Sequence, residues 1–357
     1  MQKLYRYRPL SDFLFKELFY QEIYLASYHE LNDPLDINAR IDFRTTELED
    51  VKYLLYFISK SQFDLKFYDG IDKLKPQIDA YHKYLEQQAD QEIFEKKIVE
   101  KISQLTGCIT IGRITEIISV AIKETNSNFY FDSTKFKNEV EDFSCKFLRN
   151  SYVSCFSESN DNFLMWSHYA SKHSGVCLEF TVKDNTFPLE LVGRRKKNDD
   201  KYYERLSEWE LQSHIYWDNI YKVNYKTEQS CINFYEFIPV IENQYDCDLI
   251  GLSKGWTHKY AYNLQNNFLI KIAEWAYEKE WRIIRINFDK SKFPESRIEH
   301  YPIECLSAIY FGYHTPEEVK ERIFKIINSK FYDIKYYSSK LTGGAKIEFE
   351  EWLYEEE

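Results

Sequence analysis

The chain has 357 residues, of which 44% are hydrophobic and 18% aromatic, and this excludes an intrinsically disordered protein because so much apolar surface is available for burial. Its 10 glycines and 8 prolines are too few for a collagen-like or linker-rich protein, and they predict long elements with few tight turns. With 47 basic against 58 acidic residues the net charge is −11, so binding to nucleic acid or to an anionic membrane would need a local basic patch.

No stretch of the sequence has the roughly 18 consecutive apolar residues of a membrane-spanning helix, and the first residues lack the apolar region of a signal peptide. We therefore expect a cytoplasmic protein without a membrane segment. The seven cysteines are odd in number, widely separated and without zinc-ligand spacing. We expect them to be reduced, and most of them to be small core residues.

The first forty residues predict a strand, a short helix and a second strand. Residues 4–8 alternate in hydrophobicity, Ser11 is suited to cap a helix over residues 13–20, and residues 23–27 read as extended chain. Asn32-Asp33-Pro34 then predicts a turn, because Asn and Asp side chains bond to the backbone that follows them and proline fixes φ.

Residues 44–150 differ from the flanking sequence in their pattern of charged and apolar residues. Long charged stretches contain apolar residues every three or four positions, as at Val51, Leu54 and Ile58. This spacing predicts an all-helical insertion. It divides an α+β core into residues 1–43 and residues 151–357.

The second part of the core predicts alternating strands and helices that form a mixed, split β-sheet with flanking helices. The charged run Arg194 to Lys197 indicates a loop. Lys271, Glu274 and Glu278 have helical spacing and indicate the solvated face of a helix. The expected strands cover residues 152–157, 176–182, 221–225, 280–288, 308–312 and 333–337, and the expected helices cover 162–172, a segment running towards Tyr277, and a segment from Pro316.

Five motifs stand out in the two core segments. They are LYRYR at residues 4–8, LNDPLD at 31–36, CFSE at 155–158, MWSHYA followed by GVCLEF at 165–180, and EKEWRI at 278–283. Together and in this order they resemble a large bacterial family that is known as a domain of unknown function. The resemblance does not extend to the helical insertion, and membership of this family does not itself name a reaction.

The order of polar residues also resembles the ADP-ribosyltransferase fold, with Arg8 or Arg6 on the first strand, Ser157 on a middle strand and Glu280 at the start of a late strand. This resemblance implies that NAD is a substrate and that these residues line one pocket. Arg8 would bind pyrophosphate or ribose, Ser157 would orient the nicotinamide ribose, and Glu280 would stabilise developing positive charge. The residues that the resemblance further implies in NAD binding are Arg6, Trp166, His168, Tyr169, Arg282, Asn32 and Asp33.

The implied activity is that of a bacterial effector, of the toxin or anti-phage defence type, which modifies a macromolecule or hydrolyses NAD. Its macromolecular target is not indicated. On this hypothesis Glu280→Gln abolishes NAD-dependent activity and leaves the fold intact.

Each of these residues also fits a purely structural role. Arg6 and Arg8 fit the solvated face of an edge strand, and Ser157 fits a core-edge hydroxyl. Met165, His168 and Tyr169 fit core packing on one side of a helix. Glu280 fits an ion pair with Arg282, and Arg282 fits one with Asp33. In that case Glu280→Gln lowers the melting temperature instead.

Two other classes of function remain open. A metal-dependent nuclease would use carboxylates from Asp33, Asp36, Glu158, Glu179 and Glu280, although the carboxylate-x-Lys pattern of restriction-type nucleases is missing on the late strand. A non-catalytic sensor or partner-binding module would use the aromatic-rich helical insertion as its interface. Titration with NAD, with Mg²⁺ or Mn²⁺ and with short RNA distinguishes the three.

Overall fold

The chain folds as an α+β protein with a mixed β-sheet, as the sequence predicts. The computed structural model describes residues 1–33, 36, 40–62, 91–149, 151–196, 209–227, 231–237, 266, 268–286, 297–329 and 333–354. Internal contacts divide the chain into two compact units. The first comprises Met1–Asn32, Asn150–Thr227 and Lys271–Glu357, and the second comprises Asp33–Arg149 and Glu228–Ile270.

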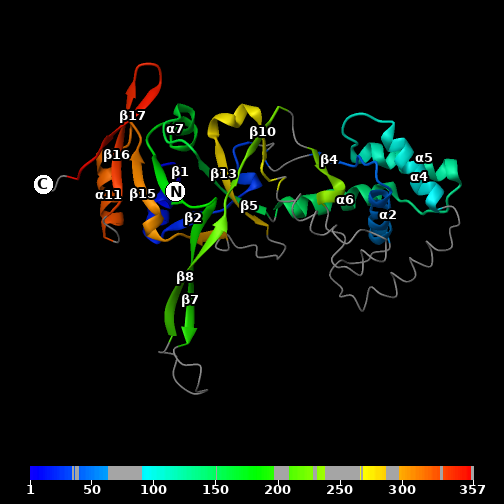
Figure 1. Ribbon diagram of the computed structural model, residues 1–357, viewed down its shortest axis with the longest axis horizontal. Coiled ribbons are helices and arrows are strands. Elements are labelled where there is room, and N and C mark those ends of the chain that lie inside the picture. The colour runs from blue at the N-terminus through cyan, green and yellow to red at the C-terminus, as the bar shows by residue number, and fades with distance from the viewer. Residues whose placement is uncertain are drawn as a thin grey trace. The chain divides into compact units, whose positions relative to one another are not determined.

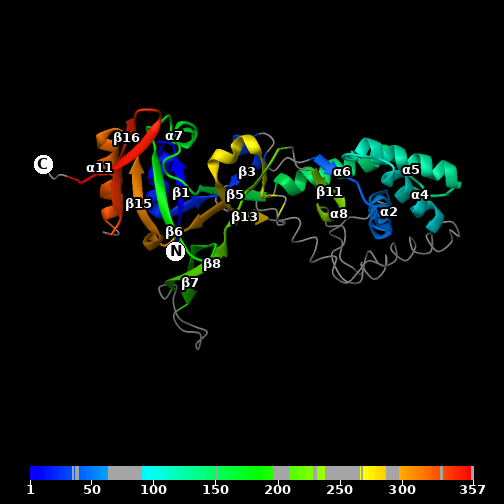
Figure 2. The same ribbon diagram turned by 45° about the horizontal axis from the view of Figure 1, so that its top comes forward.

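The first unit is built on a large sheet, which has nine strands among the described residues (Figures 1 and 2). The strands lie in the order β17-β16-β15-β6-β1-β5-β13-β9, with β3 paired to β5, and only β15 and β16 are parallel to each other. Their bounds are β1 Gln2–Arg8, β3 Ala26–Ser27, β5 Ser151–Ser157, β6 Val176–Val182, β9 Tyr221–Lys222, β13 Glu280–Ile286, β15 Leu306–Phe311, β16 Lys335–Thr342 and β17 Lys346–Glu351. The strand β6 lies between β1 and β15, which explains its nearly continuous apolar sequence.

A smaller sheet in the same unit has the order β2-β14-β7-β8, and β7 and β8 form a long hairpin that extends from it (Figure 1). The run from Arg194 to Lys197 was expected to be a loop, but Arg194, Arg195 and Lys196 belong to the end of β7, where they pair with β8. The interpretation was wrong because these charged residues are held in a strand by backbone pairing with residues 209–211 of β8, which their own sequence does not reveal. Lys197 lies outside the described residues. The bounds are β2 Glu22–Tyr24, β7 Thr186–Lys196, β8 Trp209–Asn219 and β14 Ile298–His300, and a further pair consists of β10 Asn224–Lys226 and β12 Ile270–Ile272.

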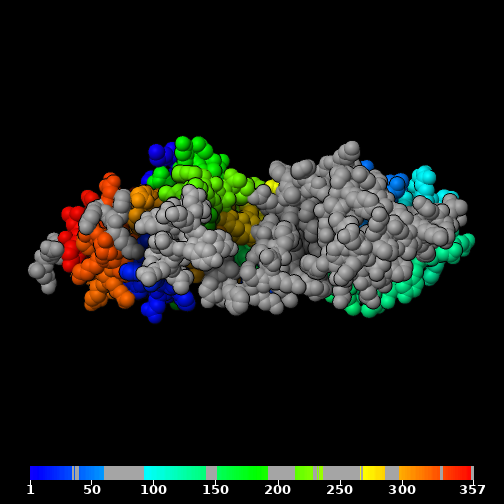
Figure 3. Space-filling view, turned by 90° about the horizontal axis from the view of Figure 1, so that it is seen from below, coloured from blue at the N-terminus to red at the C-terminus, as the bar shows by residue number. Residues whose placement is uncertain are grey.

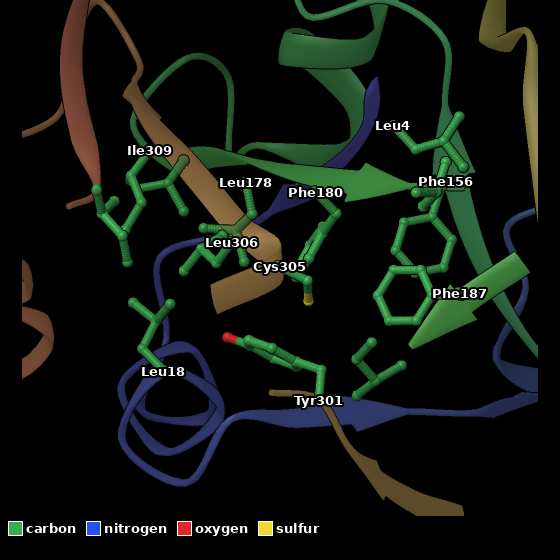
Figure 4. Close-up of a cluster of buried hydrophobic side chains, with 14 of the residues drawn as sticks. Leu4, Leu18, Phe156, Leu178, Phe180, Phe187, Tyr301, Cys305, Leu306 and Ile309 are labelled. Atoms are coloured by element: carbon green, nitrogen blue, oxygen red, sulfur yellow. The ribbon is translucent and has the colours of Figure 1, made fainter. Parts of the chain in front are cut away.

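The two faces of the large sheet carry separate hydrophobic clusters. One cluster contains Leu4, Phe156, Phe180 and Ile309 and is drawn in Figure 4. The other contains Tyr7, Trp166, Cys177 and Tyr310. The helices of this unit are α1 Asp12–Tyr20, η1 Tyr28–Glu30, α7 Phe163–Tyr169, η2 Ala273–Glu278, η4 Ile303–Cys305 and α11 Glu317–Asn328.

The helices α1 and α11 pack against the first of these clusters, to which Leu14, Leu18, Ile323 and Ile327 contribute. Both helices reach the surface, where α1 is blue and α11 is orange (Figure 3). The helix α7 lies on the other face and contributes Met165 and Trp166 to the second cluster. The sheet is therefore covered on both faces, and residues that alternate along a strand enter different environments.

The second unit is largely helical, and its described helices are α2 Leu48–Gln62, α4 Gln91–Ser103, α5 Ile111–Thr125, α6 Ser133–Arg149 and α8 Phe234–Phe237. Phe43, Phe57, Phe136 and Phe234 are buried and pack ring against ring in its core. The unit also contains the parallel pair of β4 Arg40–Asp42 and β11 Cys231–Asn233. The pairing of β11 with β4 thus joins the two separate stretches of sequence that make up this unit.

None of the helices in the described part of the chain is both long and apolar enough to cross a membrane.

Limited proteolysis of the native chain is expected to cut first near residues 44 and 150. At these two points the spacing of apolar residues in the sequence changes, and joints between separately packed regions are cleaved before the regions themselves. Mass spectrometry of the early fragments locates the cuts. Digestion of the urea-unfolded chain serves as the control, since cleavage there follows residue type alone. Early cuts inside α2 or α5 instead would contradict the predicted joints.

Candidate functional site

Three neighbouring strands of the large sheet bring Ser157 and Glu280 side by side. Ser157 on β5 is directly opposite Tyr5 on β1 and Glu280 on β13. Residues that are paired across antiparallel strands project from the same face, so these three side chains form one row. Ser157 is fully buried, and its hydroxyl donates a 2.7 Å hydrogen bond to the carbonyl of Glu278 and accepts one from the amide of Ser159.

Glu280 is held in a buried ion-pair cluster. Its Oε1 accepts from Nε of Arg282 at 2.7 Å, and its Oε2 accepts from Nη2 of Arg282 at 2.9 Å and from Nζ of Lys271 at 3.2 Å. Its amide donates to the hydroxyl of Tyr225 at 2.8 Å. Glu280 is 2% exposed and Arg282 0% exposed, so the ionic pairing with Arg282 is confirmed and lies out of contact with water.

Glu278 extends this cluster towards the surface. Nζ of Lys271 donates to its Oε2 at 2.6 Å, and the hydroxyl of Tyr169 donates to its Oε1. The Tyr169 hydroxyl in turn accepts a 2.5 Å hydrogen bond from Nδ2 of Asn32. Tyr169 is partly exposed and Asn32 is exposed, whereas both glutamates are buried, so Tyr169 and Asn32 form the rim of the cluster.

Local structure explains why both glutamates point inward. Lys279 adopts a left-handed conformation with φ of 46° and ends η2, so the chain turns directly into β13. Asn162 caps α7 by accepting from the amides of Leu164 and Met165, and its own amide group donates to the carbonyl of Tyr277 at 2.9 Å. This bond joins α7, which carries Tyr169, to η2, which carries Glu278.

The two carboxylates differ in their electrostatics. Burial by itself raises the pKa of Glu280, but Arg282 and Lys271 outweigh it and hold the pKa far below its ordinary value. Burial raises the pKa of Glu278, and the adjacent charge of Glu280 adds to this effect against the attraction of Lys271. Burial and the nearby Glu278 also raise the pKa of the Tyr169 hydroxyl. One carboxylate is therefore firmly ionised, and the other is closer to taking up a proton.

Arg6 and Arg8 alternate with Tyr5 and Tyr7 along β1, so they lie on the opposite face of the sheet from Ser157 and Glu280. Arg8 forms a bidentate pair with Glu17 of α1, at 2.7 and 2.5 Å. Arg6 is buried and donates to the carbonyl of Tyr24 at 3.1 Å, and burial lowers its pKa to about 10. The structure thus does not bring the two arginines to the same face as Ser157 and Glu280, and the expected solvated cationic face is wrong because α1 and β2 cover this side of β1.

Trp166 and His168, which precede Tyr169 on α7, have separate environments. Trp166 is fully buried in the second hydrophobic cluster, and its indole N–H donates to the carbonyl of Asn160 at 2.6 Å. His168 is exposed, with its ring 6.4 Å from that of Tyr277. The suggestion that His168 is a core histidine is therefore wrong, because it faces outward from the short helix whose other side buries Trp166.

The LNDPLD motif is divided between the two units. Asn32 belongs to the first unit, where it bonds to Tyr169. Asp33 belongs to the second unit and is buried. Pro34 and Leu35 lie outside the described residues.

Sequence reasoning missed Lys271 and Glu278. They were interpreted as the solvated face of a helix together with Glu274, but Lys271 lies on β12 with 5% exposure and Glu278 ends η2 with 3% exposure, while Glu274 alone is exposed. The periodicity was misleading because the segment is a strand followed by a 3-10 helix, for which a spacing of 3.6 has no meaning. The signal that could have identified the pair was the spacing of Glu278 and Glu280, which are two positions apart in the EKEWRI motif.

Three of the five carboxylates proposed for a metal site, Glu158, Glu179 and Glu280, have cationic partners in the structure. Lys222 donates to Glu158 at 2.6 Å, and Lys3 contacts Glu179 at 2.9 Å. Across the described ranges, no three His, Cys, Asp or Glu side chains are grouped so that they could hold a metal ion.

Comparison with known protein families gives one match, between residues 165–283 and a family described as a protein of unknown function (DUF2971). Neither a curated protein nor a solved structure matches the chain. The matched segment runs from α7 to β13 and contains most of the buried cluster, namely Tyr169, Lys271, Glu278, Glu280 and Arg282. Residues 165–283 therefore match the family DUF2971, which confirms the resemblance for the MWSHYA–GVCLEF and EKEWRI motifs, whereas the motifs at residues 4–8, 31–36 and 155–158 lie outside the matched segment.

Proposed function

We propose that the chain is an ADP-ribosyltransferase-like enzyme that cleaves the bond between nicotinamide and ribose in NAD. It transfers ADP-ribose to a macromolecule or to water, as effectors of the toxin and anti-phage defence type do. The observation that carries the proposal is the pair of buried carboxylates Glu278 and Glu280, whose pKa values are moved in opposite directions beside Ser157. Paired carboxylates with separated pKa values are the usual arrangement for cleaving a glycosidic bond.

Glu280 is suited to the electrostatic role. When the nicotinamide leaves with the bonding electrons, positive charge develops on the ribose, and a carboxylate that stays ionised stabilises that charge. Arg282 and Lys271 keep Glu280 ionised and fix its orientation through three hydrogen bonds. A preorganised anion of this kind does not have to reorient during the reaction.

Glu278 is suited to the proton transfer. The attacking hydroxyl or amine must lose a proton as it bonds to the ribose carbon, and Glu278 is the carboxylate whose pKa is raised. Tyr169 donates to it from the rim, where a substrate arrives first. Asn32, Tyr169 and the exposed ring of His168 are therefore the groups that we assign to first contact with NAD. Arg6, Arg8 and Trp166 have no part in this proposal.

The test is nicotinamide release from NAD together with calorimetric binding, using the full chain and the variant Tyr169→Phe. The variant keeps the ring but removes a hydrogen bond to a carboxylate, which is worth about 1.5–3 kcal/mol. We expect activity to fall about tenfold to a hundredfold and the melting temperature to fall by a few degrees, so activity is compared at a temperature at which both proteins are folded. Tyr277→Phe is the matched control, since its ring lies near His168 on the same side and its loss of a hydroxyl leaves the Glu278 contacts intact.

Equal activity in Tyr169→Phe and the wild type would remove Tyr169 and Glu278 from the reaction. No binding of NAD by the wild type would contradict the proposal as a whole. In that case binding of Mg²⁺ or Mn²⁺ with cleavage of RNA favours the nuclease, and binding of none of these ligands favours the partner-binding module.

A further inference from the structure

Two cysteines from distant parts of the chain meet in the second unit. Cys231 begins β11, where it is opposite Arg40 in the parallel pair with β4. Cys108 lies between α4 and α5, and its thiol is 3.8 Å from the carbonyl of Ile41, the next residue of β4. Adjacent strands are about 4.8 Å apart. Both cysteines therefore lie against β4, Cys231 at Arg40 and Cys108 at the neighbouring Ile41. The Cys231 side chain is near enough to Cys108 to contribute to the raised pKa of the Cys108 thiol.

The backbone holds this contact in place. The amide of Ile109 donates to Oδ1 of Asp42 at 2.8 Å, and the amide of Phe43 donates to the carbonyl of Ile109 at 2.9 Å. The segment that carries Cys108 is thus bonded on both sides of the next residue to the chain around β4. The two thiols are brought together by the fold and do not depend on each other for their positions.

The two thiols differ in access to solvent. Cys231 is exposed, whereas Cys108 is partly buried. Burial raises the pKa of Cys108 to about 12, and the nearby Cys231 side chain adds to the effect. Because the thiolate is the reactive form, Cys108 reacts slowly with a molecule in solution, and Cys231 meets that molecule first.

We propose that Cys108 and Cys231 are a site of thiol–disulfide exchange that reacts with small disulfides such as glutathione disulfide and closes into an intramolecular bond. The Cys231 thiolate attacks one sulfur of glutathione disulfide, forms a mixed disulfide and releases one glutathione thiolate. Cys108 then loses its proton to solvent and attacks the Cys231 sulfur, releasing the second glutathione. Two electrons pass from the thiol pair to one glutathione disulfide, which becomes two glutathione molecules.

The bond would join the two chain segments that make up the second unit, Asp33–Arg149 and Glu228–Ile270. A cross-link between segments so distant in sequence restricts the unfolded chain strongly and stabilises the fold that already brings them together. The proposal is independent of the reaction assigned to the first unit, since none of the residues of that reaction belongs to the second unit.

The full chain is treated with glutathione disulfide, alkylated under denaturing conditions and examined by intact mass and peptide mapping. We expect a loss of about 2 Da, protection of two thiols from alkylation, and a linked peptide pair that contains Cys108 and Cys231. The oxidised chain is expected to have a higher melting temperature, which returns to the original value after reduction with dithiothreitol.

Single variants test the order of the steps. Cys108→Ser is expected to stop at one glutathione on Cys231, and Cys231→Ser is expected to form neither the adduct nor the cross-link. Cys231 is exposed, so its substitution should leave the melting temperature of the reduced chain unchanged. If Cys108→Ser does not fold, the wild-type peptide map decides the question alone. A bond mapped to other cysteines, stable adducts on both residues, or unreacted thiols would overturn the proposal.

Discussion

Glu280→Gln is expected to lower the free energy of unfolding by about 3–5 kcal/mol, because it removes one partner of a buried ion pair. Arg282 is completely buried and Lys271 is almost completely buried. With Glu280 neutral, their two positive charges would face only the charge of Glu278. Chemical denaturation monitored by circular dichroism measures the loss. The buried pair thus favours the outcome predicted for a structural role of Glu280, a loss of stability, and a loss of NAD turnover is also expected.

Glu158→Gln is the matched control for this substitution. Glu158 also pairs with a lysine at the same end of the sheet, but its partner Lys222 is 56% exposed. An exposed pair of this kind contributes about 0–1 kcal/mol. The double variant of Glu280→Gln with Arg282→Met should lose less stability than the sum of the two single variants, since it leaves no guanidinium unpaired. Additive losses, or an unchanged stability of Glu280→Gln, would show that the pair does not hold the site together.

Gly312→Ala is expected to cost about 3 kcal/mol of stability, because the new methyl group collides with backbone on a neighbouring loop. A Cβ at this position would lie 2.2 Å from the carbonyl oxygen of His173. That carbonyl cannot move cheaply. It accepts from the amide of His314 at 2.8 Å, and three residues in succession, Ser171, Lys172 and His173, have φ between 47° and 68°.

Thermal unfolding of Gly312→Ala and Gly343→Ala tests the collision. Gly343 lies between β16 and β17, where an added Cβ meets nothing within 4 Å. Its substitution is expected to change stability by less than about 0.5 kcal/mol. Similar melting temperatures for the two variants would mean that the loop around His173 adapts to the methyl group.

Much of the local structure could be predicted from the sequence. The buried strand β6 was predicted at its full length, Val176–Val182, and the helix from Pro316 was confirmed as α11, Glu317–Asn328. In these segments the apolar period and the helix-starting residues agree, so propensity and packing favour the same element. Propensity and packing disagreed at Arg194 to Lys196, where pairing with β8 extends a strand through charged residues.

The sequence also indicated part of the site. The start of the EKEWRI strand was identified as the place where a charged residue must be paired, and Glu280 is indeed bonded to Arg282. The partner Lys271 could not be found in this way, because it comes from a different strand and its spacing suggested a surface helix. Tyr169 and Asn32 were named as binding residues, but their bonds to Glu278 and to each other depend on how α7 packs beside η2.

The sequence alone determined the α+β class, the strands with clear alternation and the family to which residues 165–283 are similar, since each depends on residues close together in the chain. Only the tertiary structure decided which polar groups share a face. Arg8 and Tyr5 are three positions apart on one strand, and the pleat sends Arg8 to Glu17 while Tyr5 stays in the row with Ser157 and Glu280. Alternation along one strand is visible in the sequence, but which residues of different strands share a face depends on the register that strand pairing fixes.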